Sequence, residues 1–534
     1  MQSASPTKWL SVYVRVVFLG LVTTLMLNIP ALAQEAPESQ TAFVSEATVR
    51  TGAEMLVANA TRASLPIRVI PFLPTMDPSA YAAAKAAAEA ALSAAHRPAL
   101  TQAPAPLAPP TLKDVNCDGV DQANAGGLFP PDADGAVGAI QFVQIVNSQI
   151  VVWDKAPVAG CPTQLLNVSL AAFFGYFAQT LFDPRVLYDP VFDRWVVAAE
   201  AFPESATVKL QFIAVSLTSD ATGGFFIYFF NARALSGGGN AFWDFPQIGL
   251  DEDAVIVTGN VFDPGFVGAR AWFLPKNRMY AGLGFGFCFF FGGPLNLGTI
   301  APPLVRDQSN TTVLATAPNV ANFLRIMKFT ATSRVCPIFL ASNDIPVAAY
   351  GIPPNAPQPA TNQVLHTGDN RFQNRSTQVG VFLWQTHATN DFGFATPRFY
   401  RINWTTNAIA QTDTFFHSGT SFDFKPSISA NDANDAFVTW SASSSTESPR
   451  VLGGGKQSAD GGIGPGGGLV VFISPTSLTN NFDPNFNAQR WGDYSATSID
   501  PANPSRAWAV GENVTFDPFG ANEWGTRFFN MGLP

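Results

Sequence analysis

Short runs of alternating hydrophobic and polar residues recur along this chain with a common rhythm. The stretch from Pro184 reads PRVLYDPVFDRWVV, and similar stretches begin at Pro246 (PQIGLDEDAVIVTG) and Pro426 (PSISANDANDAFVTW). In each, a β-branched residue follows the proline at the second position and an aspartate or asparagine at the fifth, before a second apolar run. Turn-forming residues between two such runs predict a β-hairpin.

The hairpins repeat with a period of about 60 residues. Pro184 and Pro246 are 62 positions apart, and Pro426 lies 180 positions after Pro246, which leaves room for two weaker copies. Looser copies begin near Pro130 and Asp493, and the two weaker ones are expected at Thr311–Phe329 and Arg371–Ala388. The expected starts are near residues 131, 184, 246, 306, 366, 426 and 493.

Repeats of this size predict a β-propeller, because a hairpin-based sheet cannot bury both faces alone and radial packing buries them. We expect an all-β fold with a seven-bladed propeller over residues 113–534, or six blades if one weak copy is an insertion. The last run, WGTRFF at Trp524–Phe529, is expected to pair near the first unit and close the ring.

Residues 34–112 have a different composition. Alanine dominates Asp77–Arg97, where Asp77 suits an N-cap and Pro78 the first helical position, so we predict a helix. The prolines of residues 98–112 predict an extended linker. We interpret 34–112 as an Ala/Pro-rich helical spacer; an inhibitory or chaperoning pro-segment removed after export is the alternative.

The first 33 residues predict a signal peptide. Lys8 and Arg15 lead into the apolar run Val16–Leu27, and Ala31–Ala33 supplies small residues for cleavage. The apolar run is shorter than the roughly 20 residues that a spanning helix needs. We therefore expect a secreted protein, in an extracellular, periplasmic or cell-surface location, with no membrane span after cleavage.

The composition supports many short strands and argues against nucleic acid as a partner. The chain has 46 Phe, 43 Gly and 42 Pro, which favours strands joined by tight turns. Its formal net charge is −9, and its 30 Lys and Arg residues are scattered. Phosphate binding needs a concentrated basic surface, which this sequence does not offer.

Export permits disulfides, and the chain has four cysteines that allow three pairings. We expect neighbours to pair, Cys117 with Cys161 and Cys288 with Cys336. None has a His or Cys partner at the spacing of a zinc site, which argues against a metal–thiolate centre.

Four stretches together carry a resemblance: PPDADGAVG, DPRVLYDPVFDRW, FPQIGLDEDAVIVTGN and RWGDYSATSIDP. They resemble a mostly uncharacterised family of bacterial secreted proteins with a sialidase-like β-propeller. The resemblance covers about residue 115 to the end of the chain. It implies the fold far more than an activity.

No catalytic constellation is recognisable. A sialidase-like site would need an arginine cluster, a Tyr–Glu pair and an acidic Asp converging on the propeller axis. Arg185, Arg371 and Arg490 lie at blade starts, but the Ser-x-Asp-x-Gly-x-Thr-Trp turns typical of such enzymes are absent. The four histidines are dispersed, without a metal-binding pair or a nucleophile elbow, so the sequence leaves open whether this is an enzyme.

A calcium loop is one candidate site. In DVNCDG, the oxygen-bearing residues Asp114, Asn116 and Asp118 alternate and a glycine follows. Ala125 stands where such a loop would place its closing acidic ligand, so a plain polar turn is the alternative. Calcium is the only cofactor that the sequence suggests.

Acidic residues precede the first strand of several units, so radial stacking would gather them at one rim. With nearby polar residues they form our predicted ligand-binding set: Asp134, Asp183, Arg185, Asp244, Gln247, Asp423, Arg490 and Asp493. The alternative is that they cap turns. We expect a non-catalytic binding or structural module for extracellular glycan or protein; the alternative is an extracellular glycan hydrolase of sialidase-like type.

Overall fold

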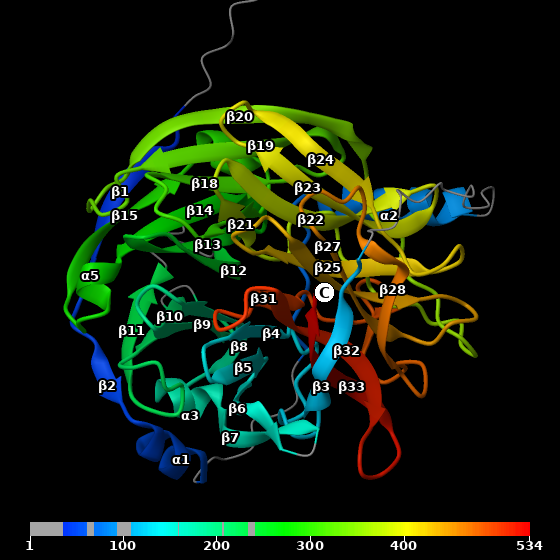
Figure 1. Cartoon of the computed structure of the whole chain (residues 1–534), viewed down its shortest axis with the longest axis horizontal. Coiled ribbons are helices and arrows are strands. Elements are labelled where there is room, and N and C mark those ends of the chain that lie inside the picture. The colour runs from blue at the N-terminus through cyan, green and yellow to red at the C-terminus, as the bar shows by residue number, and fades with distance from the viewer. Residues whose placement is uncertain (1–35, 61–68, 93–107, 159, 206–207, 233–240) are drawn as a thin grey trace, which may run out of the picture. The chain divides into compact units, whose positions relative to one another are not determined.

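Short antiparallel strands form sheets that stand around a common centre (Figure 1). This computed structural model describes residues 36–60, 69–92, 108–158, 160–205, 208–232 and 241–534. The predicted signal peptide and most of the proline-rich linker lie outside the described residues. Glu35–Pro534 forms one unit, and the expected all-β propeller is confirmed.

Antiparallel pairing sorts most of the described strands into seven groups, which we call blades. Blade 1 contains β4 (Asp134–Val137), β5 (Gln141–Val146), β6 (Gln149–Val158) and β7 (Cys161–Ser169). Blade 2 contains β8 (Thr180–Asp189), β9 (Arg194–Phe202), β10 (Leu210–Ser216) and β11 (Phe225–Asn231). Blade 3 contains β12 (Phe242–Leu250), β13 (Ala254–Asp263), β14 (Gly265–Pro275) and β15 (Phe285–Phe291). Blade 4 contains β16 (Ile300–Ala301), β18 (Thr311–Thr316), β19 (Ala321–Thr330) and β20 (Ile338–Tyr350). Blade 5 contains β21 (Ser376–Val379), β22 (Phe382–Asp391), β23 (Phe394–Asn403) and β24 (Ala408–Thr414). Blade 6 contains β25 (Phe422–Ala430), β26 (Ala436–Ser443), β27 (Arg450–Lys456) and β28 (Gly464–Ile473). Blade 7 contains β31 (Ala496–Ile499), β32 (Arg506–Phe516), β33 (Asn522–Gly532) and β3 (Thr111–Asp121).

Short elements connect the blades. The strand β17 (Pro303–Val305) pairs in parallel with β12 and β21, which joins blades 3 and 5 into one ten-stranded sheet. Other short elements lie between strands: α3 (Leu170–Phe174), α5 (Lys276–Met279), the 3-10 helix η1 (Gly293–Leu297) and the small pair β29 (Phe482–Asp483) and β30 (Ala488–Gln489).

The repeated proline marks a β-bulge in the innermost strand. In blades 2, 3 and 6 the register shifts at Pro184, Pro246 and Pro426. Proline has no N–H to donate to a neighbouring strand, so a bulge accommodates it. The residue before each proline has a positive φ: 47° at Asp183, 59° at Phe245 and 51° at Lys425. This conformation is unusual for residues other than glycine, and such positions concentrate at functional sites.

Aromatic side chains fill the space between blades. Phe142 of blade 1 stacks on Trp508 of blade 7, with ring centroids 5.2 Å apart. Trp243 of blade 3 donates its indole N–H to Gln211 Oε1 of blade 2. Among the described residues, eight tryptophans are fully buried: Trp195, Trp243, Trp272, Trp384, Trp440, Trp491, Trp508 and Trp524.

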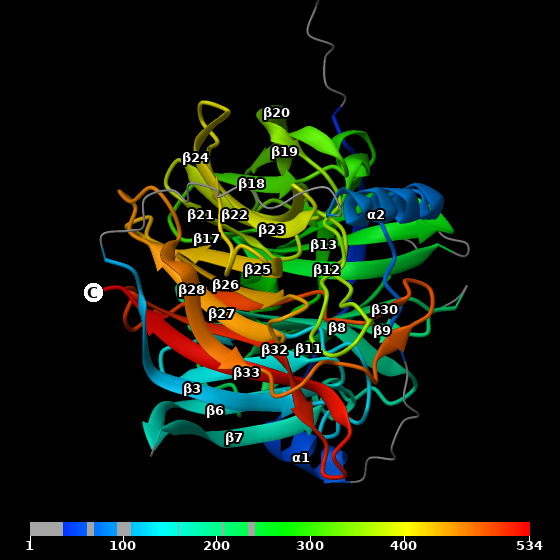
Figure 2. The same cartoon turned by 90° about the vertical axis from the view of Figure 1, so that its right-hand side faces the viewer.

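The N-terminal residues differ from the expected spacer, because they belong to the propeller unit. Strand β1 (Glu38–Val44) extends blade 3 along β15, and β2 (Thr48–Arg50) extends blade 2 along β11. Helix α1 (Gly52–Ala60) packs against α3. The predicted alanine-rich helix is α2 (Pro78–Leu92), capped by Asp77, and it packs on the propeller on the opposite side from the C-terminus (Figure 2).

The ring closes through β3. This strand lies outermost in blade 7, paired with β33, which contains the expected closing run WGTRFF. The two expected disulfides are confirmed, Cys117–Cys161 and Cys288–Cys336. The first joins β3 of blade 7 to β7 of blade 1, so a covalent bond spans the closure. None of the described helices is long and apolar enough to cross a membrane.

Candidate functional site

Charged residues from most of the blades meet at the centre of the ring. Asp183 of blade 2 accepts a hydrogen bond from Tyr494, which precedes blade 7. Arg375, which precedes blade 5, pairs with Asp134 of blade 1 at 3.1 Å. Because such distant blades touch only around the axis, these contacts define an axial cluster. It includes Asp134, Asp183, Arg185, Glu200, Asp244, Asp369, Arg371, Arg375, Lys425, Arg490, Asp493 and Tyr494.

The central loop 366–375 fills much of the axis. Its sequence, HTGDNRFQNR, is almost entirely buried despite its polarity. Arg185 donates hydrogen bonds to the Pro246 and Gln373 carbonyls and to Asn374 Oδ1. Within the loop, Arg371 makes a two-pronged ion pair with Asp369, at 2.8 Å for each bond. These charged groups of the loop are therefore paired, whereas both polar atoms of the Gln373 side chain and Asn370 Oδ1 have no hydrogen-bond partner among the described residues.

Asp493 is the hub of a second group of charges. Its carboxylate pairs with Arg490 at 2.6 Å and with Lys425 at 3.0 Å. Burial alone would raise the pKa of Asp493, but the two cations hold this pKa well below its ordinary value. The Asp493 N–H also donates to Asp132 Oδ1, which ties blade 7 to blade 1.

Aromatic rings separate the guanidinium groups along the axis. The Arg185 guanidinium lies 3.2 Å from the Tyr494 ring centroid. Arg371 lies between Phe72 at 4.7 Å and Phe245 at 4.6 Å, and Phe72 is also 5.6 Å from Arg490. Cation–π contacts stabilise such desolvated guanidinium groups.

The N-terminal segment covers one end of this cluster. Arg490 donates to the Ile70 carbonyl and Arg371 to the Leu73 carbonyl, with Phe72 between them. The side chains of Tyr81 and Lys85 on α2 continue the cover toward His366 and Thr367 of the central loop. Both arginines that reach this end therefore donate hydrogen bonds to protein groups, and Arg371 Nη1 is the part of these guanidinium groups without a partner among the described residues.

Three carboxyl groups stand apart from the ion pairs. Oxygen atoms of Asp183, Glu200 and Asp244 all lie within 4.8 Å of one another, and all three residues are buried. Burial, reinforced by neighbouring carboxylates, raises the pKa of Asp183 and of Glu200 well above their ordinary values. Burial also raises the pKa of Asp244, to about 7, although Arg371 acts in the opposite direction. Three buried carboxyl groups so close together, which we call the carboxyl triad, disfavour three simultaneous negative charges.

A large pocket lies between α2 and the propeller, beside the covered end of the axial cluster. We call it the mouth pocket; its volume is about 860 Å³. Asn355 Oδ1 and His366 Nδ1 are buried without a hydrogen-bond partner among the described residues. The lining combines rings and polar groups, among them Phe72, Tyr81, Phe422, Phe486, Lys85, Asn355, His366 and Asn485.

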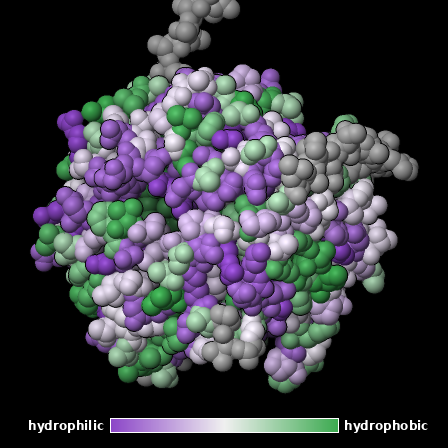
Figure 3. Space-filling view, viewed as in Figure 1, coloured by the Kyte–Doolittle hydropathy of each residue, from purple (hydrophilic) through white to green (hydrophobic). Residues whose placement is uncertain are grey.

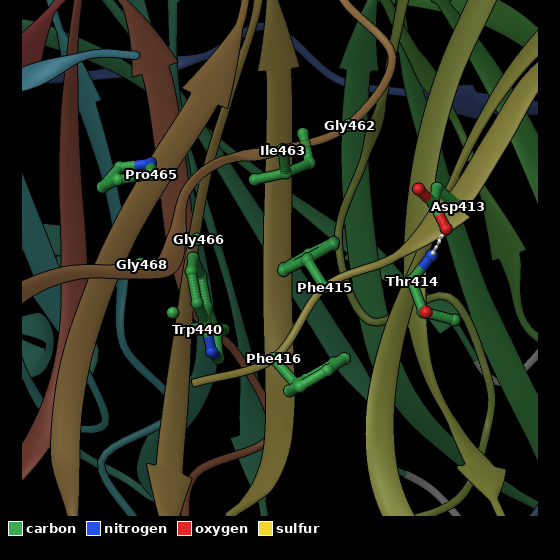
Figure 4. A pocket seen from close by; sticks show the side chains of 11 residues that line it. Asp413, Thr414, Phe415, Phe416, Trp440, Gly462, Ile463, Pro465, Gly466 and Gly468 are labelled. Carbon is green, nitrogen blue, oxygen red and sulfur yellow. Dashed lines mark hydrogen bonds between the residues drawn. The ribbon is translucent and has the colours of Figure 1, made fainter. Parts of the chain in front are cut away.

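Two other hollows are less suited to a ligand. One, of about 380 Å³, lies where the innermost strands end and includes the paired charges Lys276–Asp189 and Arg306–Asp432. The other, beside Phe415, Trp440 and Ile463, measures only about 20 Å³, which is room for a water molecule (Figure 4). On the face shown in Figure 3, hydrophilic and hydrophobic residues are interspersed.

The structure brings most of the predicted ligand-binding residues together, but buries them. Gln247 donates to the Phe372 carbonyl of the central loop, while its own Oε1 has no partner of good geometry among the described residues. Asp423 lies apart, where it accepts hydrogen bonds from the His417 N–H, the Ser421 hydroxyl and the Trp440 indole. This is the turn-capping role that we gave as the alternative.

The expected calcium loop is a strand instead. Residues 114–118 lie in β3, where pairing with β33 holds the backbone extended. Arg506 pairs with Asp114 at 2.5 Å, and Arg527 contacts both Asn116 and Asp118. Arginines thus occupy the positions where an ion would have been needed, and the calcium prediction loses its geometric basis.

Comparisons with known proteins give likeness among solved structures only. No family model matches the chain, and no curated protein matches it. An exo-β-1,3-galactanase from Phanerochaete chrysosporium, solved with β-1,3-galactotriose, has a TM-score of 0.32 and 9% identity, over 79% of this chain and 96% of that one. The hemagglutinin-neuraminidase of parainfluenza virus 5 has a TM-score of 0.33 and 10% identity, over 67% and 93%. A GH43_1 enzyme from Xanthomonas citri, complexed with xylose, has a TM-score of 0.31 and 11% identity, over 71% and 96%. Likeness at this level says nothing about the activity of this chain.

Proposed function

We propose that this protein is a secreted or cell-surface binding module that holds an extracellular glycan in the mouth pocket. The observation that carries the proposal is the lining of this pocket. Sugar rings present C–H faces and hydroxyl groups, which suit aromatic rings and amide side chains respectively. The unpartnered Asn355 Oδ1 is an acceptor that a sugar hydroxyl would satisfy, and the unpartnered His366 Nδ1 donates or accepts according to its tautomer, either of which a sugar hydroxyl can match.

An exported location is part of the proposal. The two disulfides fit an oxidising compartment, as does the predicted signal peptide. Detection of the mature protein outside the cytosol by fractionation, with both disulfides intact in non-reducing peptide maps, is the expected result. Free thiols in the exported protein would contradict it.

The test of binding is a glycan array followed by calorimetry on the mature chain. Phe486 lies beside Phe72, Tyr81 and His366, with ring centroids 4.5 to 6.0 Å away. We expect Phe486→Ala to weaken glycan binding at least about tenfold, because it removes a stacking surface. Phe519→Ala is the matched control, since Phe519 is 94% exposed and does not line the pocket. Absence of any array signal, or an equal loss in both variants, would refute the proposal.

A hydrolase is the second candidate, favoured by the convergence of Arg185, Arg371 and Arg490 with Tyr494 and the carboxyl triad. Against it, each of these arginines already has protein partners, and the triad does not line the mouth pocket. Release of 4-methylumbelliferone from sialyl, galactosyl or xylosyl glycosides, lost in Asp244→Asn, would favour the hydrolase over the binding module.

A further inference from the structure

Lys85 is a buried amine on the wall of the mouth pocket. Its Nζ donates to the Pro353 carbonyl at 2.7 Å and to Thr367 Oγ1 at 2.6 Å. Thr367 turns its own hydroxyl proton to the Pro354 carbonyl at 3.0 Å, so it is free to accept from Lys85. The ion pairs of the described residues do not include this amine, and the nearby Asp369 and Asp493 pair with Arg371 and with Lys425 instead.

The number of acceptors matches a neutral amine. A neutral lysine has two N–H donors, whereas an ammonium group has three. The two acceptors on Lys85 therefore satisfy the neutral form completely and leave its lone pair unused. A buried ammonium group without a counter-ion would be costly.

Burial and the surrounding charges also favour the neutral form of Lys85. Burial, followed by the nearby Lys425, lowers the pKa of Lys85 well below its ordinary value, while Glu89 and Asp369 oppose this only partly. The Tyr81 ring centroid is 5.8 Å from Nζ, and the Tyr81 hydroxyl is hydrogen-bonded to His366. Burial lowers the pKa of His366 as well, so a second neutral base lines the pocket.

We propose that Lys85 is a nucleophile that forms an imine with an aldehyde or ketone bound in the mouth pocket. The geometry that supports this is a neutral amine with both N–H groups oriented by fixed acceptors, on the wall of a pocket large enough for a small organic ligand. The inference does not depend on glycan binding.

The reaction balances without an oxidant or reductant. The Nζ lone pair forms a bond to the carbonyl carbon, and the C=O electron pair moves to oxygen, which gives a carbinolamine. The C–O bond then breaks, and the oxygen leaves as water with the two protons that the amine loses. The product is a C=N bond, and Tyr81 and His366 line the same pocket as groups able to exchange those protons.

The test is reductive trapping of the mature chain with glycolaldehyde and cyanoborohydride at pH 6, 7 and 8. Nα-acetyl-lysine in the same tube is the reference amine, and mass spectrometry of peptides gives the label at each lysine. The reference gains neutral amine about tenfold per pH unit below its pKa. A Lys85 that stays neutral over this range does not gain in the same way, so we expect its labelling relative to the reference to fall about tenfold from pH 6 to 7 and again from 7 to 8.

Two lysines distinguish reactivity from burial. Lys425 is buried like Lys85, at 1% against 6% exposed, but pairs with Asp493 and does not line the mouth pocket, so it should stay unlabelled. Lys85→Met should remove the label from its peptide; if that variant fails to fold, the pH ratio in the wild-type chain still decides. An unlabelled Lys85 at saturating glycolaldehyde, or a ratio that does not change with pH, overturns the proposal.

Discussion

At the scale of single residues, the axial cluster shows how much buried charge this fold contains. Arg185, Arg371 and Arg490 are at most 1% exposed, in a chain with only 13% charged residues. Buried ion pairs often add little net stability, but breaking one by removing a single partner leaves an uncompensated charge. The loss in free energy of unfolding on substitution therefore shows whether a buried charge stabilises the fold.

Arg490→Ala is expected to lower the free energy of unfolding by about 3–5 kcal/mol, because Asp493 loses its closest cation. Urea unfolding of the mature chain measures the change. The control is Arg325→Ala, whose pair with Asp344 is partly exposed and should cost only about 0–1 kcal/mol. If Arg185 and Arg490 are both replaced by Ala and glycan binding is lost without a change in Tm, these arginines form a ligand site instead.

The carboxyl triad predicts a pH dependence of stability. The pKa of Asp244 is about 7 in the folded protein, against an ordinary value of about 3.9. Between these pH values the folded state binds a proton that the unfolded state has lost, so this residue makes stability fall as pH rises from about 4 to 7.

The side chain of the Asp244→Asn variant cannot ionise, so the contribution of residue 244 to the fall in stability with rising pH should disappear. Between pH 4 and pH 8, we expect the free energy of unfolding of the variant, measured in urea, to increase relative to that of wild type by on the order of 2–4 kcal/mol. Asp253→Asn, in the exposed turn between β12 and β13, is the matched control. A difference between Asp244→Asn and wild type that stays constant with pH would contradict the assignment.

The sequence predicts part of this residue-scale picture. The proline-led repeat locates Asp183, Arg185 and Asp244 at strand starts, and the bulge then turns these positions toward the axis. Lys85 is not predicted, because its alanine-rich surroundings indicate an exposed helix. Glu200 is also missed, since it lies within the apolar strand β9, and only the register of β9 with β8, where Glu200 pairs with Phe182, brings it close to Asp183.

At the scale of elements, the largest difference from expectation is the role of the N-terminal segment. Strand β1 reads ESQTAFV and is mostly exposed, so it lacks the apolar alternation that identifies central strands. Edge strands of this kind are specified by the neighbour that they cover, here β15 with its run of phenylalanines. That information is in another part of the chain and is not visible locally.

Strand β3 and the Cys117–Cys161 disulfide together hold the first and last blades. Closing a loop of 44 residues should stabilise the fold by about 4 kcal/mol. We expect Cys117→Ser with Cys161→Ser to lose about that much, and to increase hydrogen exchange in β3 and β33. Replacing Cys288 and Cys336, 48 residues apart, should cost a similar amount but leave exchange in β3 unchanged. Equal exchange in both double variants would show that the first disulfide does not hold the closure.

At the scale of the whole molecule, periodicity predicts the ring better than it predicts the centre. The innermost strands begin at residues 134, 180, 242, 300, 376, 422 and 496, close to the expected starts. The largest difference is in blade 5, where β21 begins at Ser376 rather than near 366 because loop 366–375 runs into the axis. A polar decapeptide reads as a surface loop, and only the ring of opposing charges makes its burial favourable.

The mouth pocket is lined by residues of α2 and of the propeller, so its ligand should contact both. Ala82 lines the pocket from α2, whereas its neighbour Ala83 does not, and both side chains are exposed. We expect Ala82→Trp to block the pocket and abolish binding of the array-identified glycan, while Ala83→Trp binds as wild type. A ligand that binds only the folded chain stabilises it by about 2.7 kcal/mol at a concentration of 100 times Kd. The Tm of wild type and Ala83→Trp should therefore rise with the glycan, and that of Ala82→Trp should not. A Tm rise in Ala82→Trp equal to that of wild type would place the ligand elsewhere on the propeller.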